Sequence, residues 1–413
     1  METEWEEIRK MILEHLDSTY ELDDEQLKEE ISAETGEFAK SHLLSLKERE
    51  KMEMQVFNSL RKLDVIQELL EDPEVTEIMV NGYHRIFYEK EGTLFAWDKS
   101  FSSAERLEAV VQQIAAYANK TVNEAEPIAD TRLSDGSRVN IVVPPASLDG
   151  PCVTIRKFSA TPVTLQRLED LGSISGEIHR LLHLLVRSGY NLFVSGGTGS
   201  GKTTLLNALS QAIPKGERIV TIEDSAELHL LGIENLVRME ARQANVNGAG
   251  EITIRDLIRT SLRMRPDRII VGEVRGEEAL ELLQANNTGH DGGMSTGHAN
   301  SCHDMLSRLE TMVLMGMDLP LSAVRGQISS GIDVMIHLAR MRDRTRKVVQ
   351  ICEMDGMEGG EIRLYPLYEF RETGEKQGKV IGEWKRVGSL KHRAKLRACG
   401  LERELLQIYQ NEE

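Results

Sequence analysis

The chain has 413 residues and a formal net charge of −17. Because one hydrophobic core rarely serves a chain of this length, we expect two or three domains. The negative charge argues against duplex nucleic acid as the main partner, since such proteins need a basic face that displaces counterions. The four cysteines are dispersed and form no CxxC pair, which argues against a disulfide scaffold or a zinc site.

The composition of the first twenty residues leads us to expect no signal peptide there. The first twenty residues are acidic and contain no apolar stretch. No apolar run in the chain approaches the roughly 20 residues that a membrane-spanning helix needs. We therefore expect a cytoplasmic protein that reaches a membrane only through a partner or a surface.

The elements predicted in chain order divide the sequence into four parts. Residues 1–65 have apolar side chains at helical spacing and form a helical segment without visible chemistry. Residues 66–158 mix strands and one helix and form a small α+β domain. Its predicted strands cover residues 75–80, 85–88, 139–143 and 152–158, and its helix covers residues 103–119.

Residues 159–164, with Pro162 among them, are predicted to be a linker. From residue 165 to 413 helices alternate with the strands predicted at 191–195, 218–222 and 268–271. Such alternation indicates an α/β fold with a doubly wound, mostly parallel sheet. A late hairpin over 347–370 and a helical tail after Arg386 complete this part.

The segment from Gly196 to Thr203 matches the phosphate-loop pattern GxxxxGK[ST]. An apolar strand precedes it and a helix-forming segment follows, which is the context that the pattern requires. Glycines allow main-chain N–H groups to turn toward a phosphate, while the helix adds the positive end of its dipole. We therefore expect Lys202 to contact the β and γ phosphates of ATP and the Thr203 hydroxyl to bind Mg²⁺. The candidate nucleotide-binding residues are Gly196, Gly197, Thr198, Gly199, Ser200, Gly201, Lys202, Thr203 and Thr204.

Acidic residues follow two of the predicted strands. Glu223 and Asp224 end the strand after the loop's helix, and Glu273 follows the apolar strand 268–271 through Gly272. Acids at the carboxyl ends of parallel strands face the ligand crevice. Glu273 is expected to hold Mg²⁺ through water or to act as a general base on the attacking water. A surface acid or a helix cap is the alternative for Glu223 and Asp224.

Two histidines stand in a Gly-rich stretch downstream, His290 and His298. We expect a histidine in a Gly-rich loop after a helix to approach a γ-phosphate and respond to its loss. A zinc site is the rival interpretation, but the neighbouring cysteine and histidines do not supply a fourth ligand at the required spacing. An ordinary structural histidine is the second alternative.

The α+β domain contains arginines in turn-rich segments, and Arg132, Arg138 and Arg156 are the candidates for a catalytic role. Phosphoryl transfer builds negative charge on the equatorial oxygens, which an arginine from another domain or subunit stabilises. A solvated or salt-bridged arginine is the alternative at each position.

Four motifs now stand in order: the phosphate loop, an acidic box over residues 222–227, the strand ending in Gly272-Glu273, and a histidine box over residues 288–301. With these motifs, residues 55–370 resemble the type II/type IV secretion ATPase family, in particular the CpaF-like branch that powers tight-adherence (Flp) pilus assembly. The resemblance implies a RecA-like P-loop NTPase core preceded by a smaller α+β domain and a helical segment.

The resemblance also implies a homohexameric ring at the cytoplasmic face of the inner membrane, working with a membrane platform protein. Nucleotide would bind between the N-terminal domain and the RecA-like domain, and ATP hydrolysis would move them. The matching positions are Lys202 and Thr203 for phosphate and Mg²⁺, Glu273 for the Walker B acid, Glu223 for the acidic box, His298 for the histidine box, and Arg132, Arg138 and Arg156 for the N-domain arginines.

Two other functions fit a P-loop core. A nucleic-acid translocating ATPase would need a basic channel, which the negative charge disfavours. A small-molecule kinase would be monomeric and need a lid over a second substrate pocket. Stimulation by DNA and the size of the particle in the presence of ATP would separate these functions from a secretion motor.

Overall fold

The computed structural model describes residues 2–15, 22–42, 44–90, 92–157, 163–242, 244 and 250–410. It divides into two compact units, Met1–Ala160 and Thr161–Glu413. Most of the predicted linker, residues 159–162, lies outside the described residues. Within the described part of the chain, no helix is long and apolar enough to cross a membrane.

The first unit begins with three helices, α1 (Glu2–His15), α2 (Asp24–His42) and α3 (Leu46–Arg61). They bury a small core of their own that includes Ile8, Ile31 and Val56. Helix α3 starts at a capping box in which the Ser45 hydroxyl accepts from the Glu48 N–H while the Glu48 carboxylate accepts from the Ser45 N–H. This reciprocal pair satisfies two main-chain donors that a helix start otherwise leaves open.

An antiparallel sheet with strand order β3-β2-β1-β6-β5-β4 forms the rest of the first unit. Its strands are β1 (Val75–Asn81), β2 (Ile86–Lys90), β3 (Thr93–Ala96), β4 (Ile128–Arg132), β5 (Arg138–Val142) and β6 (Cys152–Arg156). The short helices η1 (Asp64–Ile66) and α4 (Gln67–Glu71) precede it, and α5 (Ala104–Tyr117) buries an apolar stripe in the same core. Alternate strand residues such as Ile78 and Val80 face that core, as the pleat requires.

A nine-stranded sheet organises the second unit, with strand order β15-β14-β13-β12-β7-β11-β10-β8-β9. The parallel strands are β7 (Leu192–Gly196), β8 (Ile219–Glu223), β9 (Leu236–Glu240), β10 (Arg268–Val271), β11 (Met294–Gly297) and β12 (Val334–Arg340). An antiparallel extension is formed by β13 (Arg346–Glu358), β14 (Glu361–Lys376) and β15 (Lys379–Arg386). The predicted late hairpin is therefore present and runs on into a third strand.

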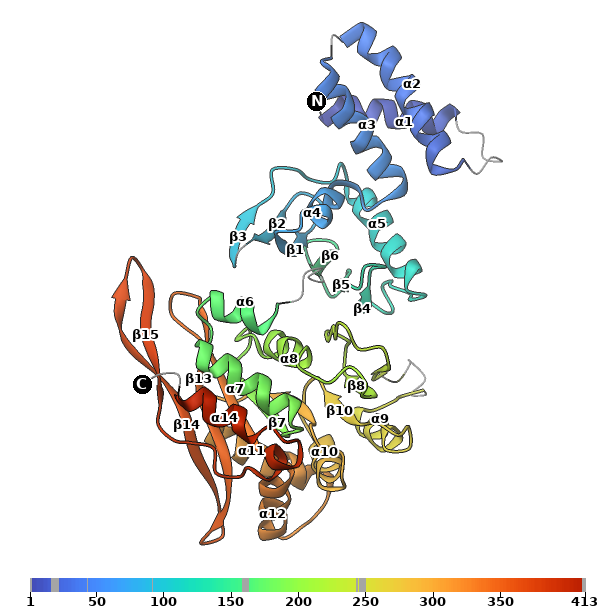
Figure 1. Ribbon diagram of the computed structural model, residues 1–413. Coiled ribbons are helices and arrows are strands. Elements are labelled where there is room, and N and C mark those ends of the chain that lie inside the picture. The colour runs from blue at the N-terminus through green and yellow to red at the C-terminus, as the bar shows by residue number, and fades with distance from the viewer. Residues whose placement is uncertain are drawn as a thin grey trace. The chain divides into compact units, whose positions relative to one another are not determined.

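Helices cover both faces of this sheet (Figure 1). The helices of one face are α6 (Leu165–Asp170), α7 (Gly176–Arg187), α8 (Lys202–Ser210), α13 (Ala394–Ala398) and α14 (Glu402–Gln410). Those of the other are α9 (Ile254–Ser261), α10 (Glu278–Asn287), α11 (Cys302–Gly316) and α12 (Leu321–Gly331). Within β7, Leu192 and Val194 join the first core while Phe193 joins the second. A central strand buried on both faces reads as a continuous apolar run, which is why the sequence predicts it.

Candidate functional site

The carboxyl ends of four adjacent parallel strands carry the predicted chemistry. In the spatial order β7-β11-β10-β8 these ends lead into the phosphate loop, His298, Glu273 and Glu223. Because parallel strands all point the same way, these residues meet along one edge of the sheet. The sheet therefore gathers side chains that are up to about a hundred residues apart in sequence.

The phosphate loop turns sharply between β7 and α8. Gly199 and Gly201 adopt positive φ values of 69° and 96°, which side chains with a Cβ rarely tolerate. Gly201 caps α8 without any side-chain hydrogen bond, and the helix begins at Lys202. Its first N–H groups and its dipole are thus directed at the loop, where a phosphate would bind.

Lys202 lies inside this loop rather than in solvent. Its ammonium group donates to the carbonyl oxygens of Gly196 at 3.1 Å and Gly197 at 3.2 Å, and to Nδ1 of His298 at 3.2 Å. Burial lowers the pKa of Lys202, while the Glu273 carboxylate opposes that shift. The side chain is therefore already aimed along the loop.

His298 connects the lysine to a carboxylate. Lysine has only donors, so Nδ1 of His298 accepts the lysine bond and the ring proton sits on Nε2. That nitrogen lies 2.7 Å from Oε1 of Glu273. Burial lowers the pKa of His298, and the Glu273 carboxylate again opposes the shift. His298 is therefore a neutral imidazole that lies between the Lys202 ammonium and the Glu273 carboxylate.

Glu273 also pairs with an arginine that the sequence analysis did not single out. Both Nε and Nη2 of Arg275 donate to Oε2 of Glu273, at 2.9 and 2.6 Å. Arg275 further approaches the carboxylate of Asp224 at 3.6 Å. This arginine joins the acids at the ends of β10 and β8. Its only sequence signal was its position two residues after the Walker B acid.

Glu223 stands in a different environment, 3% exposed at the end of β8. One oxygen, Oε1, accepts from the N–H groups of Glu227 at 2.8 Å and Leu228 at 2.9 Å. The other, Oε2, is buried without a hydrogen-bond partner among the described residues. Burial is the main cause that raises the pKa of Glu223 to about 6.

The glycine before Glu273 is explained by this buried carboxylate. A Cβ at Gly272 would lie 2.8 Å from Cγ and 3.1 Å from Oε1 of Glu223. The departure from the commoner Walker B ending thus reflects the space that Glu223 occupies. The two acids are neighbours across the strand pair β8–β10.

Thr203 has a carboxylate beside its hydroxyl, and both offer oxygen ligands of the kind that a hard cation prefers. Its hydroxyl donates to Oε2 of Glu227 at 3.3 Å, so this third acid of the acidic box lies beside the start of α8. Mg²⁺ prefers oxygen ligands and keeps several waters, binding proteins through few groups plus substrate phosphates. The hydroxyl and the nearby carboxylates fit that pattern. No cluster of three or more His, Cys, Asp or Glu suited to a metal occurs among the described residues.

The two histidines of the histidine box are separated by the length of β11. His298 follows its carboxyl end and His290 precedes its amino end. The expectation of a Gly-rich loop there was wrong over residues 294–297, which form a buried central strand. Only His298 therefore joins the site at the phosphate loop.

The three predicted arginines belong to the first unit and form one row. Arg132 is opposite Arg138 across β4–β5, and Arg138 is opposite Arg156 across β5–β6. Residues directly opposite one another point to the same face of a sheet. The register therefore places three guanidinium groups on one face, in a unit that does not contain the phosphate loop.

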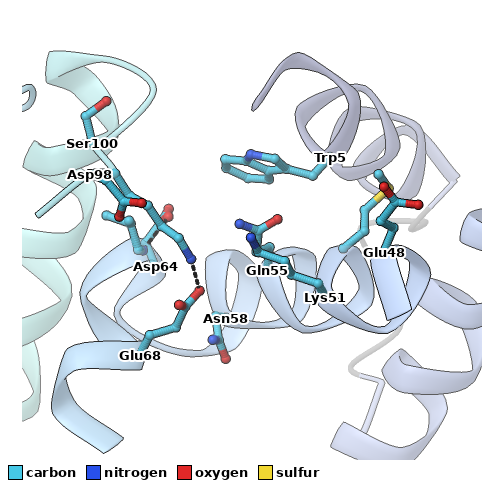
Figure 2. A pocket seen from close by; sticks show the side chains of 12 residues that line it. Trp5, Glu48, Lys51, Gln55, Asn58, Asp64, Glu68, Asp98 and Ser100 are labelled. Carbon is cyan, nitrogen blue, oxygen red and sulfur yellow. Dashed lines mark hydrogen bonds and ion pairs between the residues drawn. The ribbon is translucent and has the colours of Figure 1, made fainter. Parts of the chain in front are cut away.

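A solvent-open cavity of about 300 Å³ adjoins the phosphate loop. Its lining consists of Gly197, Thr198, His298, Ala299, Asn300, Asp304 and Arg308. A second cavity of about 190 Å³ lies in the first unit, between Trp5 of α1, helix α3 and the segment with Asp98 and Ser100 (Figure 2). Two of its acids already have cations: Glu68 pairs with Lys99, and Asp64 with Arg106. We place the candidate site at the first cavity.

These features define a P-loop nucleoside triphosphatase with a RecA-like core. They are a glycine loop between a buried parallel strand and a helix, a lysine inside that loop, and acids at the ends of neighbouring strands. The X-ray structure of the Legionella pneumophila ATPase DotB shares this fold. It has a TM-score of 0.51 and 20% sequence identity, and the match covers 70% of this chain and 79% of that one.

Sequence comparison shows the family. Residues 59–396 match the family described as type II/IV secretion system protein. A putative conjugal transfer protein of Mycobacterium tuberculosis is 35% identical over 301 residues, which are 71% of this chain and 85% of that protein. The type IV secretion system protein PtlH of Bordetella pertussis is 34% identical over 324 residues, covering 71% and 95%. The chain belongs to the type II/IV secretion system protein family, and it is an ATPase of that class.

Proposed function

We propose that the chain is the ATP-driven motor of a pilus or secretion machine and that it works as a homohexameric ring. The observation that carries this proposal is the convergence of Lys202, His298 and Glu273 at the phosphate loop. The relatives named for conjugal transfer and type IV secretion support the setting. In this proposal the ring sits at the cytoplasmic face of the membrane and acts on a membrane platform protein.

Each site residue has a distinct part in the proposed mechanism. Main-chain N–H groups of the phosphate loop and the Lys202 ammonium hold the β and γ phosphates of ATP. Thr203 and, through water, Glu273 would hold Mg²⁺, whose positive charge would offset the negative charge of the phosphates. Glu223 takes a proton from the attacking water. Its pKa of about 6 lies near the working pH, which suits a general base.

His298 is proposed to report the state of the γ-phosphate. It bridges Lys202 and Glu273, so a phosphate that draws Lys202 away also releases one partner of the imidazole. The histidine then changes its hydrogen bonds when the γ-phosphate arrives or leaves. This residue would thereby couple the chemistry to the position of the loop that follows β11.

The arginine row of the first unit is proposed to supply positive charge to the transition state. The register puts three guanidinium groups on one face of the sheet, which can present several positive charges together to a phosphate chain. A triphosphate that reaches this face would be stabilised by that positive charge. Arg138 lies in the middle of the row and is the first candidate for the catalytic arginine.

Within the family, we propose that the chain belongs to the CpaF-like branch, which assembles tight-adherence (Flp) pili. Support comes from the combination of residues 75–82, the arginine segment 132–140 and the four ordered motifs. Deleting the gene should remove surface pili from the source cell, and a Lys202→Ala copy should fail to restore them. Normal pili in the deleted strain would contradict this assignment.

Replacing Lys202 with Ala tests the site itself. It removes the only ammonium group inside the described phosphate loop, so ATP hydrolysis should fall below detection while the chain stays folded. A matched Lys215→Ala variant changes an exposed lysine of the same unit and should hydrolyse ATP normally. Both variants are compared with the wild type by the rate of phosphate release and by the thermal midpoint. Wild-type turnover by the Lys202→Ala variant would refute the assignment of the phosphate loop. Light scattering with Mg-ATP checks for a hexameric mass.

Replacing Arg138 with Ala tests the arginine row. Because two neighbouring arginines remain, kcat should fall roughly 10-fold or more, less than the about 10³-fold that a complete arginine finger supplies. KM and the thermal midpoint should change little. Arg85→Ala is the control, since Arg85 is an exposed arginine of the same unit paired with Asp149. Equal kcat values for the two variants would remove Arg138 from the mechanism.

A further inference from the structure

The turn between β12 and β13 is far from the phosphate loop in sequence, yet the residue that follows it contacts that loop. The segment 341–345 joins β12 to β13, and Arg346 begins β13. Nε of Arg346 donates to the carbonyl oxygen of Gly199 at 3.0 Å, across 147 residues of sequence. The Cδ atom of the same side chain would lie 3.4 Å from a Cβ on Gly201. Arg346 therefore contacts the loop at the two glycines that have positive φ values.

The contact fixes the direction of one peptide group. In a planar trans peptide the carbonyl oxygen and the next N–H point in opposite directions. With the Gly199 oxygen held outward by Arg346, the Ser200 N–H points across the loop, where it donates to the Gly197 oxygen at 3.3 Å. N–H groups with this inward direction are the ones that bind phosphate.

The loop has the freedom to lose this arrangement. Gly199 and Gly201 reach many backbone conformations that other residues cannot. The peptide that joins Gly199 to Ser200 has a glycine on its N-terminal side, so it rotates more easily than one between two residues with a Cβ unless a neighbour holds it. Gly199 is exposed, and the only hydrogen bond to its carbonyl among the described residues comes from Arg346. One side chain thus selects the orientation of a phosphate-binding N–H.

The turn that carries Arg346 is itself held in place. The Asp343 carboxylate accepts from the Thr345 N–H at 2.9 Å and from the Val380 N–H at 2.7 Å. Arg342 pairs with Glu372 at 2.6 Å and with Glu375 at 3.0 Å. These bonds tie the turn to β14 and to the start of β15. The guanidinium of Arg346 therefore extends from a braced segment and needs little further ordering to reach Gly199.

We propose that Arg346 is a positioning residue for the nucleotide: it holds the Gly199 carbonyl outward so that the Ser200 N–H is preset for the phosphate chain. The proposal rests on the proposed ATPase function and deepens it. Arg346 acts through the main chain and does not touch the phosphates. Its effect is expected in the binding of ADP and ATP rather than in the chemical step.

Two replacements of Arg346 separate the effect of its hydrogen-bond donor from the effect of its positive charge. Glutamine carries Nε2 the same number of bonds from the backbone as Nε of arginine, so Arg346→Gln keeps a donor at that point without the charge. Arg346→Met has similar length and no donor. The control is Arg363→Met, an exposed arginine on β14 that pairs with Asp355 and Glu358. The wild type and the three variants are compared by the calorimetric Kd for Mg-ADP and by their kcat, KM and thermal midpoint.

The expected pattern is a split between binding and chemistry. Arg346→Met should raise the Kd for Mg-ADP and the KM for ATP roughly 3- to 10-fold, the usual worth of one hydrogen bond. Its kcat and thermal midpoint should stay at the wild-type values. Arg346→Gln should bind nucleotide like wild type, as should Arg363→Met.

Every other result overturns the proposal. Wild-type binding by Arg346→Met shows that the Gly199 contact is not used. Equal weakening in the methionine and glutamine variants shows that the positive charge, and not the donor to Gly199, carries the effect. A failure of the wild-type protein to bind Mg-ADP at all would instead sink the proposed ATPase function, so the two failures are distinguishable.

Discussion

The ends of β8 and β10 present two carboxylates in contrasting surroundings. Glu223 on β8 is almost wholly buried, held by two main-chain N–H groups, and its pKa is raised to about 6. Glu273 after β10 has the imidazole of His298 beside one oxygen and the guanidinium of Arg275 on the other. Neighbouring acids thus have different surroundings: burial suits Glu223 to accept a proton, while Glu273 is held by a guanidinium group.

Replacing each acid with glutamine is the most direct way to break this comparison. Glu223→Gln should lower kcat about 10²- to 10⁴-fold, the usual contribution of a general base, with little change in Mg-ATP affinity. Glu273→Gln should instead weaken the dependence of nucleotide binding on Mg²⁺, because it removes the carboxylate that we propose holds the metal through water. Single-turnover hydrolysis and ATP titrations with and without Mg²⁺ measure both effects. Identical profiles for the two variants would show that the acids share one role.

The strands that lead to these acids were predicted from sequence because they are short apolar runs. The segments 191–195, 218–222 and 268–271 correspond to β7, β8 and β10 within a residue or so at each end. The phosphate loop was equally visible, since its glycines, lysine and threonine are contiguous. Local patterns of this kind carry their information within a single element.

Strand β11 was missed for a physical reason. Its sequence Met-Ser-Thr-Gly reads as a loop, yet it runs buried between β7 and β10. The polar groups are tolerated there partly because the Thr296 hydroxyl donates to the Gly272 carbonyl at 2.7 Å. Such a partner becomes apparent only in the fold. For the same reason the contacts of Arg275 and Arg346 could not be derived from the sequence, because register and turn geometry create them.

A substitution with a smaller expected effect fills the space between the ends of β8 and β10. A Cβ at position 272 would lie 2.8 Å from Cγ of Glu223, so Gly272→Ala should push that side chain from its two N–H donors. Overpacking of this kind costs about 1–3 kcal/mol of stability. Because Glu223 moves and the phosphate loop does not, kcat should fall with little change in ADP affinity.

Gly326→Ala provides the control for that variant. Nothing lies within 4 Å of a Cβ at Gly326, which is inside helix α12. Alanine in a helix interior is favoured over glycine by roughly 0.5–1 kcal/mol, so the control should be slightly stabilised. Chemical denaturation and steady-state kinetics compare the two. A Gly272→Ala protein as stable and as active as wild type would mean that Glu223 has room to move without consequence.

The smallest expected effect is a pH dependence of stability that belongs to Glu223 alone. Its folded pKa of about 6 exceeds the ordinary value of 4.5 because burial disfavours the ionised form. A raised carboxyl pKa means that the stability contribution is complete below pH 4.5 and is lost as pH rises through 6. The shift corresponds to about 2 kcal/mol, at 1.36 kcal/mol per pH unit.

Glu223→Gln lacks this titration, so the difference in thermal midpoint between variant and wild type isolates it. The thermal midpoint of the variant should rise relative to that of the wild type as pH increases from 4.5 to 7, with most of the change between pH 5 and 6.5. Other titrating groups cancel in the difference because both proteins share them. A gap that stays constant over this range would show that the protein does not penalise the ionised form of Glu223, and the contrast with Glu273 would then rest on their hydrogen-bond partners alone.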